Sequence, residues 1–230
     1  RIKRASKESN WTFQVGGGMF LKNVIISLLV ALLLFIGINI GLKMVYPIDH
    51  TEYIIKYSNE YELDPYLIAS IINVESKYDI KAKSKKDARG LMQITPKTGQ
   101  WASRELNLQN YSVESLYNPE TNIKIGCWYI NVLNQEFNGN LKLVLAAYNG
   151  GSGNVKSWLN NSEYSCDGEN LDHIPFKETE DYLEKVLKNY KMYKKIYKKI
   201  ITHGLNTFDS LLGNCLITLK KIVKQFLVNI

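Results

Sequence analysis

The stretch Asp64-Pro-Tyr-Leu-Ile-Ala-Ser-Ile-Ile-Asn-Val-Glu-Ser76 decides the fold prediction for this chain. Asp64 suits the capping of free amides at a helix start, and the proline that follows suits the first helical turn. An apolar stripe at helical spacing then runs through Ile68, Ile71 and Ile72. The next position on that stripe is Glu75, so the segment predicts a helix with a carboxyl group on or beside its apolar face.

Glu75 permits two interpretations. Burial disfavours the charged form of a carboxyl group, and so does a position near the negative end of the helix dipole. Both effects raise the pKa, and a glutamic acid that stays protonated near neutral pH is what general-acid cleavage of a glycosidic bond requires. The alternative is an ordinary glutamate at a fraying helix end with its carboxylate in solvent, which is the common placement of Glu.

Four short motifs begin at this glutamate and follow one another along the chain. They are Glu75-Ser76, Gly90-Leu-Met-Gln93, Ala147-Tyr-Asn149 and Glu178-Thr-x-x-Tyr182, with Asn122-Ile123 and Gly126 between the second and the third. In this order and spacing the chain resembles the Slt-type lytic transglycosylase family, over roughly residues 50–195. The resemblance implies a lysozyme-like fold, and the helical periodicity with no alternation of period two independently predicts an all-α domain.

The resemblance also implies an activity. Family members cleave the β-1,4 bond between N-acetylmuramic acid and N-acetylglucosamine in peptidoglycan without consuming water, and leave a 1,6-anhydromuramyl end. One group then suffices, with Glu75 protonating the leaving oxygen and afterwards acting as the base on the muramyl 6-hydroxyl. Two alternatives are a hydrolytic muramidase that resembles goose-type lysozyme and a non-catalytic peptidoglycan-binding module of a secretion, conjugation or sporulation apparatus.

Six further residues are expected around the sugar because they match positions in the family motifs. Hydroxyl and amide groups pair with sugar hydroxyls and N-acetyl groups, and a tyrosine ring offers a flat apolar face to a pyranose. Taken singly, each has an ordinary alternative, such as a core tyrosine or a turn-forming asparagine. The expected substrate-binding residues are Ser84, Met92, Gln93, Tyr148, Asn149 and Tyr182.

The chain departs from the family pattern at three positions. Ile80 stands where proline is common, Asp87 where glycine is common, and Gly150 where alanine is usual. Asp87 raises a question because a second carboxylate near the first is typical of a conventional glycoside hydrolase. Its setting in the charged loop 85–89 favours a solvated or salt-bridged side chain, as for most loop charges.

Upstream of this domain lies the uncharged run 23–42, which approaches the ~20 residues needed to cross a bilayer. Basic residues precede it, so the positive-inside tendency predicts a cytoplasmic N-terminus and an extracytoplasmic catalytic domain. No convincing cleavage site follows the run, which favours a retained anchor in the cell membrane. We therefore expect a flank at 1–18, a transmembrane signal anchor at 19–45, the lysozyme-like domain at 46–201 and a basic amphipathic segment of unassigned role at 202–230.

Residues at the two ends carry further expectations. Val15-Gly-Gly-Gly18 precedes Met19-Phe-Leu-Lys22, so we expect the native start at Met19. Lysines and tyrosines alternate along 185–199, which permits nucleic-acid binding, but tyrosines at this spacing more often pack inward while the lysines face solvent. The favoured prediction is that nucleic acid is not a partner, and that the net charge of +7 suits work beside anionic wall polymers.

The cysteines and histidines predict neither a disulfide framework nor a metal site. Three cysteines leave at least one unpaired in a monomer, and the three histidines show no metal-site spacing. The chemistry proposed for Glu75 needs no metal and no cofactor. The residues concerned are Cys127, Cys166, Cys215, His50, His173 and His203.

Overall fold

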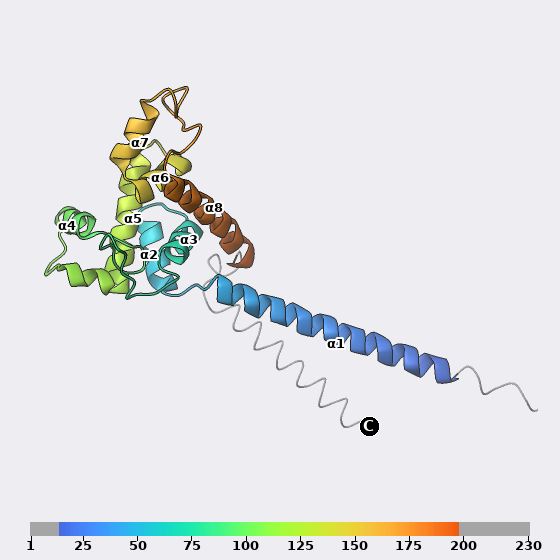
Figure 1. Ribbon diagram of the computed structural model, residues 1–230. Coiled ribbons are helices and arrows are strands. Elements are labelled where there is room, and N and C mark those ends of the chain that lie inside the picture. Colours follow the sequence, from blue (N-terminus) through green and yellow to red (C-terminus); the bar gives the residue numbers. More distant parts are fainter. Residues whose placement is uncertain (1–13, 198–230) are drawn as a thin grey trace, which may run out of the picture. The chain divides into compact units, whose positions relative to one another are not determined.

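The computed structural model describes residues 14–197, and their side chains from residue 21 onward (Figure 1). The chain divides into two units, residues 1–45 and 46–230. The basic segment 202–230 with Cys215 and residues 1–13 of the expected flank lie outside the described residues, and the expected native start at Met19 stays a prediction. The structure therefore bears on the anchor and on the domain that follows it, and each unit is described by itself.

The described part of the first unit is helix α1, Gln14–Val45. The sequence predicted an anchor from residue 19, and the helix begins somewhat earlier. Its segment Leu21–Val45 contains an 18-residue window with a mean hydropathy of 2.7 and is long and apolar enough to cross a membrane by length and composition. The predicted N-terminal apolar helix is thus confirmed.

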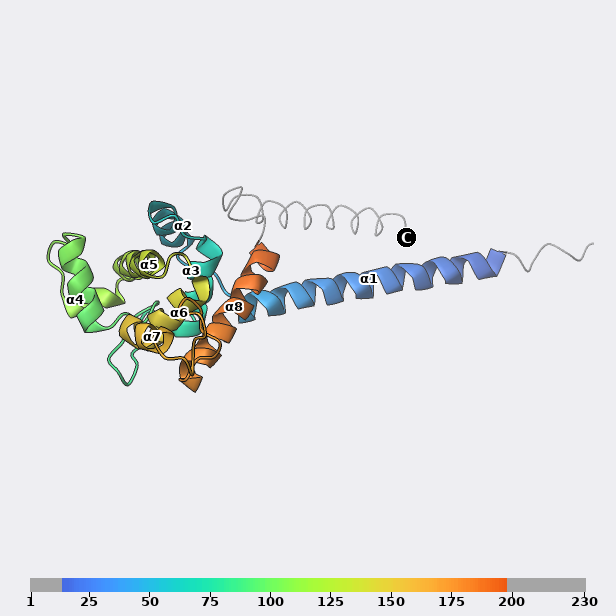
Figure 2. The same cartoon turned by 90° about the horizontal axis from the view of Figure 1, so that it is seen from above.

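The described part of the second unit is helical, and between residues 14 and 197 the structure contains no strand, as predicted. Two isolated β-bridges join Lys83 to Arg89 and Arg89 to Ile94 in the loop after α3. Figures 1 and 2 both place α4 and α8 on opposite sides of the group formed by α3, α5 and α6. The elements are α2 (Thr51–Glu60), α3 (Pro65–Glu75), α4 (Pro96–Glu105), the 3-10 helix η1 (Val113–Tyr117), α5 (Pro119–Glu136), α6 (Leu141–Gly150), α7 (Ser152–Leu159) and α8 (Lys177–Tyr197).

Local sequence explains where the helices begin. The Asp64 side chain accepts from the Tyr66 amide at 2.9 Å, and Asn118 caps α5 by accepting from the Thr121 amide at 3.0 Å. Helices α3, α4 and α5 each have proline in the first turn, where the missing N–H costs no helical bond. The capped start of α3 predicted from the sequence is confirmed.

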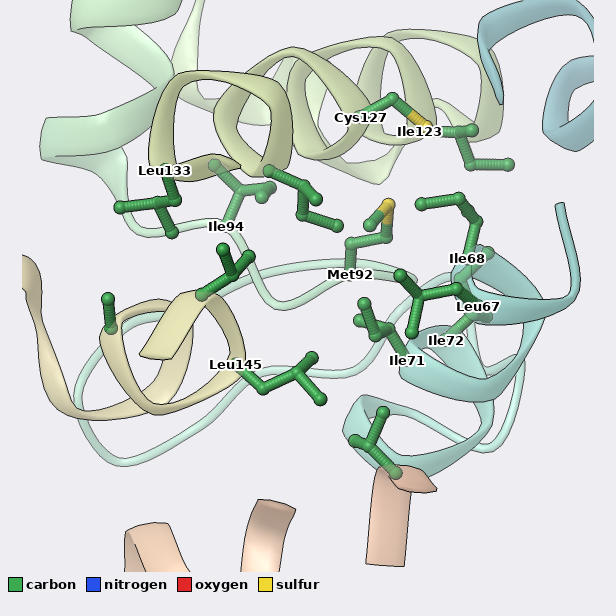
Figure 3. Close-up of a cluster of buried hydrophobic side chains, with 14 of the residues drawn as sticks. Leu67, Ile68, Ile71, Ile72, Met92, Ile94, Ile123, Cys127, Leu133 and Leu145 are labelled. Carbon is green, nitrogen blue, oxygen red and sulfur yellow. The ribbon is translucent and has the colours of Figure 1, made fainter. Parts of the chain in front are cut away.

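The core lies between α3, α5 and α6, where apolar side chains from separate elements interdigitate (Figure 3). Ile68, Ile71 and Ile72 are fully buried on α3, so the predicted stripe does face the core. Helix α8 packs against α3 and is tied to the segment before α2 by the hydroxyls of Tyr193 and Tyr197, which donate to backbone carbonyls there. Along α8 the tyrosines at 193 and 197 pack inward while Lys185, Lys188, Lys191 and Lys195 face solvent.

Candidate active site

Glu75 is the last residue of α3, and its side chain is partly buried. Removal from water is the largest influence on its carboxyl group and raises its pKa to about 7. A smaller opposing effect comes from the Tyr182 hydroxyl, and the negative charge of Glu178 raises the pKa further. At neutral pH this carboxyl group is therefore poised between its acid and base forms, which is the condition for acting as both.

Two tyrosines adjoin the Glu75 carboxyl group, from α6 and α8. Burial raises the pKa of both Tyr148 and Tyr182, and the nearby charge of Glu75 raises both further, so both hydroxyls stay protonated. The Tyr182 hydroxyl is buried and has no other hydrogen-bond partner in the described part of the chain. Its interaction with the Glu75 carboxyl group lowers the pKa of Glu75, which places this hydroxyl at the candidate catalytic group.

Hydrogen bonds tie the four motifs to one another. The Ser76 hydroxyl donates to the Leu91 carbonyl at 2.8 Å, which joins the end of α3 to the Gly-Leu-Met-Gln loop. The Tyr148 hydroxyl donates to the Met92 carbonyl at 2.7 Å, and the Thr179 hydroxyl donates to the Asn149 side-chain oxygen at 2.8 Å. These bonds join residues up to 56 positions apart in sequence and form a framework around Glu75.

Asn122 is a fully buried residue of α5 that fixes the same loop. Its side-chain oxygen accepts from the Met92 amide at 2.7 Å, and its amide nitrogen donates to the carbonyls of Arg89 and Leu116 at 2.9 and 2.7 Å. Such complete pairing offsets the cost of burying an amide. Sequence reasoning included Asn122 in a motif but assigned it no role, and it overlooked Ser76 and Thr179 as positioning residues.

An open pocket of about 260 Å³ lies beside this framework. Three expected residues line it, Gln93, Tyr148 and Asn149. The Gln93 amide nitrogen donates to the carbonyls of Ala82 and Gly90. These bonds fix the orientation of the side-chain amide and do not use its oxygen. The pocket is lined by Gln93, Ile94, Thr95, Thr98, Tyr129, Tyr148, Asn149, Gly150 and Gly151.

The expectation for Met92 was wrong. Its side chain is fully buried and occupies the middle of the core between α3 and α5 (Figure 3), so it does not line an open cleft. Gly126 makes this placement possible, because a Cβ there would overlap the Met92 sulfur. Met92 contributes to the site through its backbone, whose carbonyl accepts from Tyr148.

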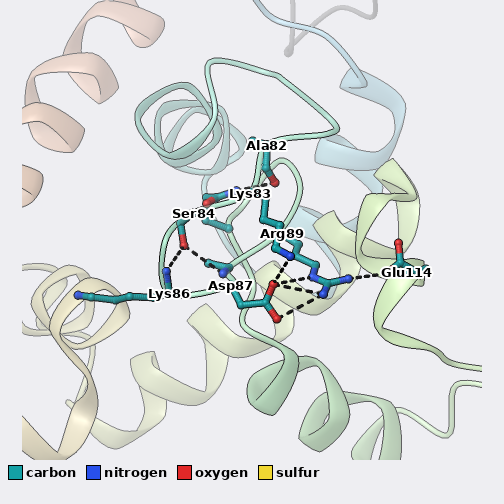
Figure 4. Close-up of polar contacts among 9 residues, drawn as sticks. Ala82, Lys83, Ser84, Lys86, Asp87, Arg89 and Glu114 are labelled. Carbon is teal, nitrogen blue, oxygen red and sulfur yellow. Dashed lines mark hydrogen bonds and ion pairs between the residues drawn. The ribbon is translucent and has the colours of Figure 1, made fainter.

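The loop that carries Ser84 and Asp87 is braced by its own polar contacts (Figure 4). The Ser84 hydroxyl accepts from the amides of Lys86 and Ala88 at 3.2 and 3.0 Å. Asp87 forms ion pairs with Lys83 at 3.0 Å and Arg89 at 3.2 Å, and Arg89 above all holds the pKa of this carboxyl below its usual value. Salt-bridging was the favoured prediction for Asp87, and it is confirmed.

The backbone explains the departure from the family pattern at this position. Asp87 has a φ of 60°, in the left-handed region where glycine is favoured and aspartate is tolerated. Gly90, nearby, has a φ of 72° and no room for a Cβ beside the Leu116 carbonyl oxygen. The loop therefore tolerates a side chain at 87 but not at 90.

Within residues 14–197, no group of three or more His, Cys, Asp or Glu side chains could hold a metal ion. The two described cysteines are free thiols, with Cys127 buried in the core and Cys166 exposed. Burial raises the pKa of the Cys127 thiol, so it is unreactive at neutral pH. The titratable group that stands out at the candidate site is Glu75.

These features define an all-α, lysozyme-like domain in which a partly buried glutamate at the end of α3 lies beside two buried tyrosines. The sequence pattern of the Transglycosylase SLT domain family matches residues 52–169. The chain belongs to this family, which confirms the resemblance found in its motifs.

Relatives and solved structures agree with that assignment. The soluble lytic murein transglycosylase of Escherichia coli K12 is 35% identical over 144 residues, which are 62% of this chain and 22% of that protein. The membrane-bound lytic murein transglycosylase E of Buchnera aphidicola (Baizongia pistaciae) is 34% identical over 58% of this chain and 73% of its own length. The crystal structure of the E. coli 70 kDa enzyme superposes with a TM-score of 0.60 at 32% identity, over 67% of this chain and 25% of that one.

Proposed function

We propose that this protein is a membrane-anchored lytic transglycosylase of peptidoglycan. The chain spans only about a fifth to a quarter of the soluble relatives, so the proposal rests on the site within the shared domain. The observation that carries it is the Glu75 carboxyl group, whose pKa is raised to about 7, mainly by burial. Support also comes from an inactive mutant of the Pseudomonas aeruginosa enzyme Slt, a glutamate-to-glutamine change, whose structure superposes with a TM-score of 0.58 at 30% identity.

In the proposed reaction, protonated Glu75 donates its proton to the oxygen that links N-acetylmuramic acid to N-acetylglucosamine. The bond from the anomeric carbon to that oxygen breaks, and an oxocarbenium-like centre forms on the muramyl ring. The muramyl 6-hydroxyl oxygen then bonds to the anomeric carbon, and its proton passes to the Glu75 carboxylate. The product is a 1,6-anhydromuramyl end, and Glu75 returns to its starting state.

Neutral groups take the place of a second carboxylate in this proposal. The Tyr182 hydroxyl interacts with Glu75, and Gln93, Tyr148 and Asn149 line the adjoining pocket. Fixed dipoles of this kind stabilise developing charge without reorganising during the reaction. Ser84 belongs to the expected binding set, but its hydroxyl already accepts two loop amides. We therefore propose that the main role of Ser84 is to stabilise the loop conformation, and that contact with the sugar is its secondary role.

Product analysis tests this function directly. Purified peptidoglycan is digested with the detergent-solubilised full chain, and the released muropeptides are weighed by mass spectrometry. We expect anhydro ends from the wild type and from the matched carboxylate control Asp87→Asn, and none from Glu75→Gln. Reducing ends would instead identify a hydrolytic muramidase, and no release by any of the three proteins would leave a peptidoglycan-binding module.

For the membrane, we propose that α1 anchors the protein with its N-terminus in the cytoplasm and residues 46–230 outside. The apolar composition of Leu21–Val45, the preceding basic residues and the membrane-bound relatives support this. Cys166 is exposed and gives a topology probe in a variant whose Cys215 is serine. A membrane-impermeant maleimide should label right-side-out vesicles and not inside-out ones, and the reverse would refute the orientation.

A further inference from the structure

A row of aromatic rings leads away from the candidate active site across three helices. Tyr148 of α6 lies 5.6 Å from Tyr129 of α5, and Tyr129 lies 6.2 Å from Trp101 of α4, measured between ring centroids. Figures 1 and 2 show α4 on the side of the domain away from α8. The row thus begins at a tyrosine that adjoins Glu75 and runs to the side opposite Tyr182.

Trp101 ends this row with 37% of its side chain exposed, which is unusual for an aromatic side chain of this size. It meets Trp128 at 4.7 Å and Tyr129 at 6.2 Å, with interplanar angles of 72° and 79°. Both contacts are edge contacts, so neither of these rings stacks flat on the indole. Trp101 is therefore braced from two sides and still presents surface to solvent, and a rigid exposed ring can bind with little loss of conformational entropy.

The pocket beside the row has a matching chemistry. Thr98 lies one helical turn before Trp101 on the same face of α4, and it lines the pocket together with Tyr129 and Tyr148. The lining residues comprise aromatic, hydroxyl, amide, glycine and aliphatic groups and no charged side chain. A neutral surface with flat rings and hydroxyls suits an uncharged sugar ring and disfavours a charged peptide.

We propose that Trp101, Tyr129 and Thr98 form an additional saccharide subsite that holds a β-1,4-linked hexosamine ring of the same glycan strand. The inference rests on the proposed function, because the occupant is the continuation of the strand cleaved at Glu75. The indole of Trp101 packs against the apolar face of the ring, and the Thr98 hydroxyl pairs with a ring substituent. The consequence is a preference for long strands over short ones.

Binding of chitin oligosaccharides, which share the β-1,4-linked N-acetylhexosamine backbone, tests the subsite. The host is the detergent-solubilised full chain carrying Glu75→Gln, and the ligands are the dimer and the hexamer, measured by calorimetry. Loss of one aromatic contact corresponds to about tenfold weaker binding of the hexamer in Trp101→Ala, with the dimer nearly unchanged. Trp101→Phe keeps a flat ring and should recover most of the hexamer affinity.

Phe176 supplies a matched control. It is 48% exposed and packs edge-on against the buried Trp158 at 4.9 Å, much as Trp101 packs against Trp128. Trp158 does not line the pocket, whereas Tyr129, which Trp101 also contacts, does. Phe176→Ala should leave the affinities for both ligands unchanged. Equal losses in Phe176→Ala and Trp101→Ala, equal losses for dimer and hexamer, or no hexamer binding by the host would each overturn the subsite.

The two proposals can fail separately. If the wild type releases anhydro muropeptides while Trp101→Ala has an unaltered KM on long glycan strands, the subsite is wrong and the proposed function stands. If Trp101 governs hexamer binding but the wild type releases no muropeptide, the subsite stands and the lytic activity is wrong. An effect of Trp101→Ala confined to a protein or lipid partner, with sugar binding intact, would also overturn the subsite.

Discussion

Glu75 at the end of α3 and Asp87 in the following loop carry the same functional group in opposite surroundings. Glu75 is partly buried, and desolvation raises its pKa to about 7. Asp87 is partly exposed between Arg89 and Lys83, which lower its pKa. The comparison indicates that surroundings, more than residue type, decide which carboxyl group can exchange a proton near neutral pH and which stays a fixed charge.

Variants at Glu75 and Asp87 should differ most in the rate of muropeptide release. Glu75→Gln removes the proton that the leaving oxygen needs, so we expect the rate of muropeptide release to fall by roughly 10²–10⁴-fold. Asp87→Asn keeps the loop backbone and should stay within about threefold of the wild type, since only partly exposed ion pairs away from Glu75 are lost. Comparable losses in both variants would make Asp87 a second catalytic carboxylate.

Substitution at Gly90, in the loop after α3, should reduce the stability of the domain. Gly90→Ala places a Cβ against the Leu116 carbonyl oxygen and the Asn122 side chain at a φ of 72°, so it should destabilise the domain by about 2–4 kcal/mol. Gly139→Ala is the matched control, because Gly139 has a φ of 75° and open space around its Cβ. It should cost only about 1 kcal/mol. Equal costs in denaturant unfolding would show that crowding at Gly90 is unimportant.

Glu75 should also make stability depend on pH. Its folded pKa of about 7 lies above the ordinary 4.5, so between these values the native state binds more protons than the unfolded state. The stability contributed by this site is therefore present below about pH 4.5 and declines as the pH rises through 7. Glu75→Gln should be the more stable protein at pH 8 by up to about 3 kcal/mol, and nearly equal at pH 5.

The smallest effect should come from the Asp87 ion pairs. Asp87→Asn should lower the free energy of unfolding only slightly, and the change should shrink in high salt. The sign is opposite to that for Glu75, because a lowered pKa contributes stability above the ordinary pKa that is lost as pH falls. Denaturant unfolding at low and high salt checks this prediction. A large loss of unfolding free energy that does not depend on salt would contradict it.

The sequence predicted what depends on local pattern. The helix carrying Glu75, its cap at Asp64 and the direction of the pKa shift follow from residues within a few turns. The bonds of Ser76 to Leu91, Asn122 to Met92 and Thr179 to Asn149 join distant segments, and no spacing rule predicts them. Met92 was assigned to the cleft because its motif lies there, whereas the gap left by Gly126 turns its side chain into the core.

The central claim is that a single carboxyl group near neutral pKa serves as both acid and base. The most direct measurement is an NMR titration of side-chain carboxyl carbons in the ¹³C-labelled protein, with Glu75 assigned by the loss of its signal in Glu75→Gln. We expect a midpoint near 7 for Glu75 and one below the usual aspartate range for Asp87. A Glu75 midpoint near 4.5, the ordinary value, would contradict the account.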